Sequence, residues 1–377
     1  MNHVLLVSDQ AMPNFLPILN SEMRPASVTL VVSERMRSRA EWLKREIGKH
    51  QVAILPDIDV GNCVSDIKAM QDVFLKWGGD HPEVFSESIL NVTGGTKPMA
   101  IAAQEVFRME NRPVFYVDIT TDSVTWISGE CNRVVLSNEP TLNQFLGLNG
   151  ISIRSGDFKS VVMNEKWRHF YGEVASDPRK WGACVRALNR IAFWADQDGS
   201  RHFEVADEDR TLPFWDEMSQ MLHADELVKY CGDGYCEEFT SADARRFCNG
   251  IWLEHYVFEV LKSFGFDRKR AMMNVKIEDT KGNLNELDAI VLHGNVCYVI
   301  EDKTKNMQRG NAADSAVYKL AQLSSQMGLK ARGILISALG IRRSDRERAR
   351  AYNVEVLDWL PDLKSGLARI FGKEIAQ

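Results

Sequence analysis

The chain has 377 residues, of which 45% are hydrophobic and 26% are charged, and its formal net charge is −6. This length favours two or three domains over one, and the composition is ordinary for a globular protein. The negative balance excludes a uniformly basic nucleic-acid coat protein, so any contact with nucleic acid needs a local basic groove.

The N-terminal residues MNHVLLVSDQ lack the basic start and the small-residue cleavage pattern of a signal peptide, and no apolar run is long enough to span a membrane. The seven cysteines are scattered. The closest pair, Cys231 and Cys236, has no His or Cys cluster beside it that would complete a zinc site. We therefore expect reduced thiols and a cytoplasmic protein without membrane contact.

Strands and helices alternate along the first part of the chain. Strands are predicted at 4–8, 28–33, 52–55, 89–93 and 114–118, helices at 35–47, around 67–74 and at 98–110, and a terminal hairpin at 123–127 and 133–136. This alternation is typical of a doubly wound, mostly parallel sheet, and it predicts an α/β, Rossmann-like domain over residues 1–140.

The middle of the chain, residues 141–235, shows no clear sheet pattern. Helices are predicted around 157–173, 179–194 and 213–230, which indicates a helical connector or a small helical domain.

The last part, residues 236–377, begins with one long predicted helix, 242–264, which Gly265 ends. Strands are then predicted at 272–278, 285–292 and 296–303, a helix at 312–327, a strand at 333–337, and a closing helix and strand at 342–352 and 354–357. The core order is therefore αβββαβ.

Two apolar strands flank a turn signal, Gly294-Asn295, in the segment NELDAIVLHGNVCYVIEDKT. A two-residue turn there pairs the residues on either side, and counting outward places Asp288 opposite Glu301. The polar residues expected to share this face of the hairpin are Glu286, Asp288, Glu301 and Lys303. Facing carboxylates repel each other, and a divalent cation between them would remove that penalty. The alternative is a structural ion pair between the opposed Glu286 and Lys303 at the end of the sheet.

A third acid lies on the apolar stripe of the long predicted helix. Glu254 is three residues after Ile251 and four before Phe258, on the stripe that also contains Phe247 and Leu261. A carboxylate at this position points toward the core. It is either satisfied there by a structural partner or approaches the two acids of the hairpin.

Glu254 on a helix, Asp288 on a strand and Glu301-Asp302-Lys303 on the next strand resemble the pattern of PD-(D/E)XK nucleases, and the element order matches the core of that family. The first acidic strand reads Leu-Asp-Ala where the family name has Pro-Asp, a departure that is common in the family. The resemblance implies a restriction-endonuclease-like domain that hydrolyses phosphodiester bonds with the help of a metal ion.

The resemblance also implies a role for each residue. Asp288 and Glu301, with the backbone carbonyl of Asp302, would bind Mg²⁺ or Mn²⁺ through oxygen ligands. Lys303 would orient the attacking water or stabilise developing negative charge. Glu254 would hold the water shell of the metal, and Glu286 would assist.

A glycine-rich loop, LNVTGGTKPM, lies between a strand and a helix of the first predicted domain. Gly94 and Gly95 let backbone N–H groups approach a ligand closely, Lys97 adds a cation, and Pro98 suits a first helical turn. The spacing fits neither GxxxxGK[ST] nor GxGxxG. The loop is therefore either an anion or nucleotide cradle or a tight turn with a surface lysine.

The first strand ends at Ser8-Asp9, and the carboxyl ends of parallel strands share one edge. Ser8 and Thr93 are therefore expected to lie near each other, with Ser33 and Met36 beside them. For each of these residues an ordinary polar loop is the alternative.

A Rossmann-like domain with TGGTK before a helix resembles the CARF domains of CRISPR-associated proteins. Followed by a helical connector and a PD-(D/E)XK domain, it resembles the cyclic-oligoadenylate-activated nucleases of type III CRISPR defence. The resemblance implies a homodimer that binds cyclic tetra-adenylate across two CARF domains and, once activated, cuts single-stranded RNA or DNA or nicks duplex DNA. The ligand-binding residues that it implies are Ser8, Asp9, Asn14, Thr93, Gly94, Gly95, Thr96 and Lys97.

Two other functions remain open from the sequence. One is a ligand-sensing DNA-binding regulator with a winged-helix middle region and an inactive nuclease-like domain. The other is a constitutive repair or restriction nuclease. The arginine-rich stretch 341–350 and Arg309 are candidates for substrate phosphate contacts, with a solvated helix face as the alternative.

Overall fold

The computed structural model describes residues 1–63, 65–129, 132–158, 165–231, 236–308 and 310–373. The chain forms two compact units, each described by itself below. The first comprises Met1–Arg154, Ile277–Asn285 and Gln326–Lys330, and the second Ser155–Lys276, Glu286–Ser325 and Ala331–Gln377.

A mostly parallel sheet forms the centre of the first unit. Its strands are β1 (Asn2–Leu6), β2 (Ser27–Ser33), β3 (Ala53–Ile54), β4 (Ile58–Gly61), β5 (Ser88–Asn91), β6 (Val114–Asp118), β7 (Ser123–Ser128) and β8 (Val134–Val135). Its helices are α1 (Met12–Leu19), α2 (Arg37–Ile47), α3 (Ile67–Asp80), α4 (Pro82–Ser86), α5 (Lys97–Met109) and α6 (Leu142–Gly147). The strand order is β3-β2-β1-β5-β6-β7-β8, with β4 beside β2.

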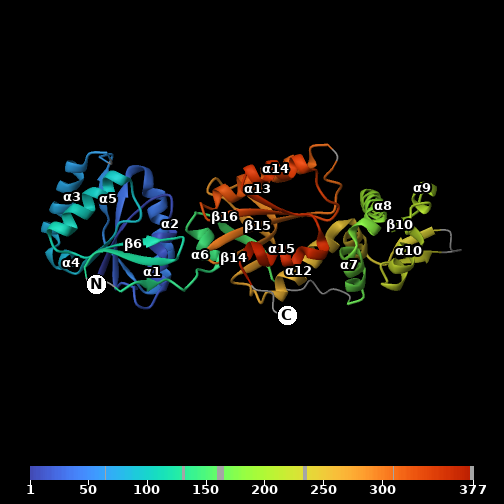
Figure 1. Ribbon diagram of the computed structural model, residues 1–377, viewed down its shortest axis with the longest axis horizontal. Coiled ribbons are helices and arrows are strands. Elements are labelled where there is room, and N and C mark those ends of the chain that lie inside the picture. The colour runs from blue at the N-terminus through green and yellow to red at the C-terminus, as the bar shows by residue number, and fades with distance from the viewer. Residues whose placement is uncertain (64, 130–131, 159–164, 232–235, 309, 374–377) are drawn as a thin grey trace. The chain divides into compact units, whose positions relative to one another are not determined.

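The doubly wound arrangement predicted for this part is confirmed. Helices α3 and α5 cover one face of the sheet, and α1 and α2 lie on the other (Figure 1). The chain runs from β1 to β2 on one side and later returns to β5 on the other side of β1. The carboxyl ends of β1 and β5 therefore form a topological switch point, where ligands of such sheets bind. Strand β4, only four residues long, was not predicted.

The middle region contains helices α7 (Trp167–Ser176), α8 (Pro178–Gln197), α9 (Asp207–Arg210) and α10 (Trp215–Ala224) and strands β9 (Ser152–Asp157), β10 (His202–Phe203), β11 (Val228–Cys231) and β12 (Cys236–Phe239). The expectation of a purely helical connector is wrong, because the last three strands form a small sheet of order β10-β12-β11. The helix predicted over 213–230 ends at Ala224, since Glu226 takes a left-handed conformation (φ 57°), and the chain then enters β11.

The helix predicted over 157–173 is also corrected. Residue 157 ends β9, which is the edge strand of the large sheet in the C-terminal part, and α7 begins only at Trp167. The stretch 159–164 of that prediction lies outside the described residues. Gly156 permits the close strand contact, because a Cβ there would lie 3.1 Å from a methyl group of Val275.

One expectation about the cysteines is wrong. Cys231 is disulfide-bonded, and its neighbour in the antiparallel register is Cys236. Cys63, Cys184 and Cys248, and also Cys297, are free thiols. In the described part of the chain no helix has the length and apolar character needed to cross a membrane.

A six-stranded sheet of order β17-β16-β15-β14-β13-β9 forms the C-terminal part. Its further strands are β13 (Ala271–Glu278), β14 (Leu284–His293), β15 (Val296–Lys303), β16 (Ala331–Ser337) and β17 (Val354–Leu357). Its helices are α11 (Ala242–Arg246), α12 (Trp252–Ser263), α13 (Ala312–Gln326), α14 (Arg343–Ala351) and α15 (Leu363–Phe371), with a short 3-10 turn at Leu360–Asp362.

The predicted αβββαβ order is confirmed in the run from α12 to β16. Helices α13 and α14 lie on one face of the sheet, and α12 and α15 on the other (Figure 1). Strands β15, β16 and β17 are parallel, so their carboxyl ends meet at one edge of the sheet.

The long helix predicted over 242–264 is not continuous. A π-helical segment, Phe247–Ile251, separates α11 from α12, and Gly250 in it has a φ of 119°. The wider turn shifts the register of the helix, so Ile251, placed on the apolar stripe by its spacing, is 36% exposed. Gly250 is required here also by contact, since a Cβ would lie 2.5 Å from Oγ1 of Thr304.

Candidate functional site

The turn between β14 and β15 sets the register of the acidic residues. Gly294 and Asn295 are both left-handed, with φ values of 56° and 57°, as a two-residue hairpin turn requires. The ladder pairs His293 with Val296 and continues to Ala289 opposite Ile300, as the spacing predicts. Beyond that pair, the backbone N–H of Asp302 donates to a carboxylate oxygen of Asp288 at 2.8 Å. The hairpin thus brings Asp288 beside the carboxyl end of β15.

One ammonium group joins the oxygens at this strand end. The Nζ atom of Lys303 lies 2.7 Å from Oε1 of Glu301 and 3.6 Å from Oδ2 of Asp288. It also donates to the carbonyl oxygen of Asp302 at 2.9 Å. Burial alone would lower the pKa of Lys303, but Asp288 and Glu301 outweigh it and raise that pKa. The ammonium group therefore stays charged and lies among the three oxygen atoms that the sequence suggests as metal ligands.

Glu286 does not take part in this contact. It is exposed, and among the described residues it makes no ion pair with Lys303. The alternative of a structural Glu286–Lys303 pair is therefore wrong. The charge of Glu286 still acts on the centre, because it helps to raise the pKa of Glu254.

A second lysine, which the sequence analysis did not identify, approaches from α13. The Nζ atom of Lys319 lies 3.1 and 2.9 Å from the two carboxylate oxygens of Glu301, which is only 4% exposed. Burial would raise the pKa of Glu301, but Lys303 and Lys319 together lower it. The signal in the sequence was a cation three residues after Ala316 and four before Leu323, both of which are buried, although Lys319 itself is partly exposed.

Glu254 reaches the centre from α12, on the other face of the sheet. Burial, followed by the charge of Asp288, raises the pKa of Glu254 to about 7, and a hydrogen bond from the side chain of Asn274 opposes that rise. Asn274, on β13, is a second contributor that the sequence did not indicate, and its backbone is left-handed (φ 50°). The expectation that Glu254 approaches the acids of the hairpin agrees with this electrostatic contact.

Asp302 has a buried carboxyl oxygen, Oδ2, without a hydrogen-bond partner among the described residues, and the residue is 7% exposed. Burial and the charges of Asp288 and Glu254 raise the pKa of Asp302 well above its usual range. Burial also raises the pKa of Asp288, with Glu301 adding to the effect and Lys303 opposing it. Crowded buried carboxylates of this kind are stabilised by a bound cation.

The residues present fit a divalent cation. Within the described part of the chain, no three His, Cys, Asp or Glu side chains are arranged to hold a metal ion by themselves. The donor set here is mixed, with two carboxylates and one backbone carbonyl, and all three already surround the ammonium group of Lys303. Oxygen donors of this type suit Mg²⁺ or Mn²⁺.

A separate cavity of about 230 Å³ lies at the switch point of the first unit. Its lining includes four residues that the resemblance implied as ligand-binding, namely Ser8, Asp9, Gly95 and Thr96, and also Ser33 and Met36. Thr96 caps α5 by accepting a hydrogen bond from the N–H of Met99 at 3.3 Å. The N-terminus of a 13-residue helix therefore faces a cavity at the predicted edge of the sheet.

Other implied ligand residues build the scaffold of this cavity and do not line it. Asn14 is 1% exposed, donates to the carbonyl of Leu6 at 2.8 Å and accepts from Asn91 at 3.0 Å. The hydroxyl of Thr93 donates to Asn91 at 2.6 Å and accepts from the N–H of Val117 at 2.7 Å. Both side chains are thus used in joining β1, β5 and β6.

Gly94 and Lys97 differ in exposure. Gly94 is buried against β1, where a Cβ would lie 1.9 Å from the carbonyl oxygen of Leu6. Lys97 is exposed at the first position of α5 and does not line the cavity.

Asp9 is held by Arg35 at 3.6 Å and Arg39 at 3.5 Å, so the acid in the described lining of this cavity is accompanied by guanidinium groups.

The arginine-rich stretch is mostly paired within the second unit. Arg342 contacts Asp345, Arg343 contacts Glu347, Arg346 contacts Asp358, and Arg348 contacts Asp314. The solvated helix face with internal ion pairs is therefore the better description of α14. Arg309 lies outside the described residues.

Comparisons with known proteins agree with this division of sites. Residues 2–139 match the family model described as the Card1 CARF domain, and residues 241–371 match the Card1-like endonuclease domain. A comparison with curated proteins finds no match.

Three solved structures are similar. Can2 from Sulfobacillus thermosulfidooxidans, in complex with cyclic tetra-adenylate, is 25% identical, with a TM-score of 0.81 over 98% of this chain and 96% of that one. VC1899 from Vibrio cholerae is 23% identical, with a TM-score of 0.84 over 98% of both chains. A type III CRISPR defence DNA nuclease activated by cyclic oligoadenylate is 18% identical, with a TM-score of 0.56 over 98% of this chain and 52% of that one.

The last two resemblances concern the fold alone. The family models cover the two sites described above, the cavity at the switch point and the carboxylate–lysine centre. The chain therefore joins a CARF domain of the Card1 type to a Card1-like endonuclease domain, and it is a nuclease.

Proposed function

We propose that this chain is a metal-dependent nuclease of the PD-(D/E)XK type that cyclic oligoadenylate activates in type III CRISPR defence. Its activator is cyclic tetra-adenylate, bound at the CARF domains of a cytoplasmic homodimer. We assign ligand sensing to residues 1–140, connection to 141–235 and catalysis to 236–377. The observation that carries the proposal is one ammonium group, that of Lys303, within 3.6 Å of Asp288, Glu301 and the carbonyl of Asp302.

The side chains at this centre can each perform one task in phosphodiester hydrolysis. Asp288, Glu301 and the carbonyl of Asp302 would hold the metal, which supplies a more acidic bound water and neutralises phosphate charge. Lys303 orients the attacking water or stabilises the charge that develops on the phosphate. Glu254, whose pKa is about 7 in the metal-free protein, would hold the water shell of the metal.

The proposed activator fits the cavity at the switch point. Can2, whose structure contains cyclic tetra-adenylate, is similar over nearly the whole of both chains. Ser8, Thr96 and the N-terminus of α5 offer hydroxyl and backbone donors, and Arg35 offers a guanidinium group. A cyclic ligand with two-fold symmetry needs two copies of this site, which is the argument for a homodimer. The ligand activates only if it binds the active state more tightly.

One incubation series tests the proposal. The protein is mixed with labelled single-stranded RNA, single-stranded DNA and supercoiled plasmid, with Mn²⁺, and with or without cyclic tetra-adenylate. We expect cleavage that needs both the metal and the activator and that Asp288→Asn and Glu301→Gln abolish. Cleavage without the activator would instead favour a constitutive nuclease, and equal behaviour of wild type and both variants would favour the regulator.

The regulator has one observation in its favour. The order α8, β10, α9, α10, β11, β12 is that of a winged helix. The helix that would enter a DNA groove, α10, begins with two acids, Asp216 and Glu217, which phosphate groups would repel. We therefore propose the nuclease function, and the experiment above would reveal a regulator if the protein is one.

A further inference from the structure

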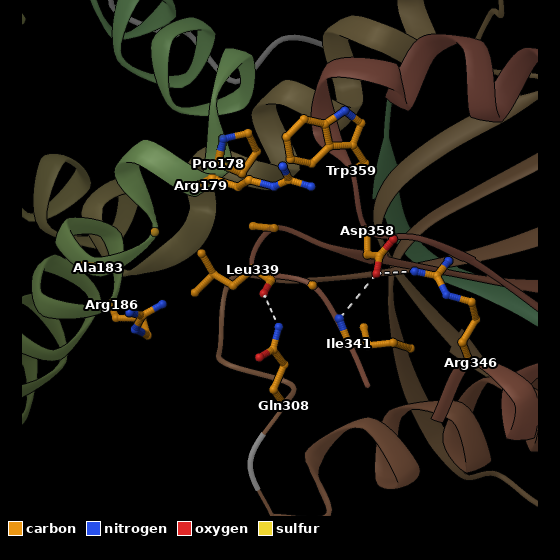
Figure 2. Close-up of a pocket in the computed structure, with 13 residues that line it drawn as sticks. Pro178, Arg179, Ala183, Arg186, Gln308, Leu339, Ile341, Arg346, Asp358 and Trp359 are labelled. Atoms are coloured by element: carbon orange, nitrogen blue, oxygen red, sulfur yellow. Dashed lines mark hydrogen bonds and ion pairs between the residues drawn. The ribbon is translucent and has the colours of Figure 1, made fainter. Parts of the chain in front are cut away.

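A cavity of about 580 Å³ lies in the second unit. Its walls come from the first turns of α8, the loop after β16 and the end of β17 (Figure 2). The N–H of Ala338, a lining residue, donates to the carbonyl of Lys303 at 3.0 Å. The cavity therefore adjoins the backbone of the strand end that carries the proposed catalytic lysine.

The loop that forms the floor of this cavity is fixed by hydrogen bonds. The side chain of Gln308 donates to the carbonyl of Leu339 at 3.3 Å, and the N–H of Ile341 donates to Asp358 at 3.4 Å (Figure 2). Asp358 also pairs with Arg346. These contacts hold the loop on the sheet without a ligand.

The cavity is basic in a chain that is acidic overall. Arg179, Arg186 and Arg346 line it, and Asp358 is the only acid among the described residues of its lining. Arg346 is neutralised by Asp358. Arg179 and Arg186 are exposed, and in the described part of the chain neither makes an ion pair with a carboxylate. Two guanidinium groups therefore remain without a carboxylate partner. A protein with a net charge of −6 needs such a local basic site if it is to bind nucleic acid.

The cavity also contains an aromatic platform. Trp359 follows Asp358 in the sequence and is 37% exposed. The guanidinium carbon of Arg179 lies 4.7 Å from the centroid of its ring (Figure 2). An exposed indole beside guanidinium groups is the surface on which unpaired bases stack. A base that is paired inside a duplex presents only its edge and cannot use it.

We propose that this cavity binds one nucleotide of a single-stranded nucleic acid next to the scissile phosphodiester. Its base stacks against Trp359 and Arg179, and its phosphate contacts Arg186. The assignment rests on the proposed nuclease function and adds a specific subsite to it. The volume is in the range of small-ligand pockets, roughly 300–1,000 Å³. Stacking does not distinguish ribose from deoxyribose, so RNA and DNA share the site.

A binding measurement tests the subsite independently of cleavage. The full-length protein is titrated against a short fluorescein-labelled single strand, RNA or DNA, with EDTA present and with cyclic tetra-adenylate added, and anisotropy is followed. We expect Trp359→Ala and Arg186→Ala each to raise the Kd about tenfold, while Trp359→Phe stays close to wild type. The matched controls are Trp194→Ala and Arg369→Ala, two exposed residues of the same unit outside the cavity, which should not change the Kd.

A set of abasic substrates locates the subsite. Single strands are prepared with one abasic position each, and cleavage by wild type is compared with cleavage by Trp359→Ala. For wild type, one abasic position beside the cut should lower kcat/KM about tenfold. The same substrate should be no worse than the intact strand for Trp359→Ala, because the stacking partner is already missing.

The outcomes separate this proposal from the nuclease assignment. A Kd that is unchanged in Trp359→Ala and Arg186→Ala, or a duplex that binds as tightly as the single strand, overturns the subsite whether or not the protein cleaves. If the wild type cleaves nothing but the Kd still depends on Trp359 and Arg186, the subsite stands and the nuclease assignment fails. Circular dichroism of each variant shows that it is folded.

Discussion

The ammonium group of Lys319 lies 2.9 Å from Oε2 of Glu301, 18 residues away in sequence and on a different element. Glu301 is thereby held between two cations, because Lys303 contacts its other oxygen. The negative charge of this buried carboxylate, and the direction of its lone pairs, depend on both lysines.

Replacing Lys319 tests whether it positions Glu301. Lys319→Ala should lower kcat about tenfold or more with little change in KM, since substrate is not expected to touch it. Lys319→Arg, which keeps the charge, should retain more activity. The free energy of unfolding should change by less than about 1 kcal/mol, because Lys319 is half-exposed. The exposed Lys262, on α12, gives a control variant, Lys262→Ala. An unchanged kcat would show that Lys319 does not position Glu301 for catalysis.

The pKa of Glu254 predicts how stability depends on pH. In the folded, metal-free protein this pKa is about 7, above the ordinary value of 4.5, so folding favours the protonated form. The stabilisation is complete below pH 4.5 and is lost as the pH rises through 7. The side chain of Glu254→Gln cannot lose a proton. At pH 8 we expect the free energy of unfolding of this variant to exceed that of wild type by on the order of 1–3 kcal/mol.

The measurement is urea unfolding with EDTA across this pH range. The two curves should converge at low pH and separate as the pH rises. Glu355→Gln, at an exposed position of β17, is the control and should follow wild type throughout. Parallel curves for wild type and Glu254→Gln would mean that Glu254 is not in this buried electrostatic cluster.

Gly94 provides a prediction about the ligand cavity. A methyl group on it would lie 1.9 Å from the carbonyl of Leu6, so β1 and the loop must separate in Gly94→Ala. We expect a loss of about 3 kcal/mol or more of unfolding free energy and a loss of activation by cyclic tetra-adenylate. Gly79, in α3, has no neighbour within 4 Å, and Gly79→Ala should be neutral or stabilising by about 0.5–1 kcal/mol. Thermal unfolding of the two variants makes the comparison.

How much the sequence predicted depended on how local each signal was. The turn at Gly294-Asn295 requires left-handed residues, so it fixed the register of the hairpin and brought Asp288 to β15. The π-helical segment could not be predicted from the same kind of count, because a regular helical spacing does not reveal the positive φ of Gly250 or its close approach to Thr304. The prediction of one continuous helix therefore placed Ile251 on the buried face, although it is exposed in the structure.

The remaining parts of the site depend on long-range packing. Lys319 reaches Glu301 only because α13 crosses the sheet above β15, and the cavity around Trp359 joins three segments that are far apart in sequence. Conversely, Asn14 was implied as a ligand residue by resemblance, but it satisfies the polar groups that join β1 and β5. A polar residue near a strand end can serve the ligand or the scaffold, and only the packing distinguishes these roles.

The ammonium group of Lys303 lies among the proposed metal ligands. A substitution of Lys303 should therefore change metal affinity and cleavage activity in opposite directions. The ammonium group lies 2.7 Å from Glu301 and 3.6 Å from Asp288, so a metal ion bound there experiences its repulsion. Lys303→Met removes that charge and leaves the acids unpaired. We expect this variant to bind Mn²⁺ about tenfold more tightly than wild type while losing cleavage, because the group that orients water is gone.

Titration calorimetry with Mn²⁺ at constant pH measures this affinity, and labelled single strands measure cleavage. Asp288→Asn, which removes a proposed ligand, should bind Mn²⁺ more weakly than wild type, so the two variants should change the Kd in opposite directions. Mn²⁺ at 100 times its Kd should also stabilise the wild type against unfolding by about 2.7 kcal/mol. Weaker binding by Lys303→Met than by wild type would show that the ion lies elsewhere, because removing a nearby positive charge cannot by itself weaken the hold of carboxylates on a cation.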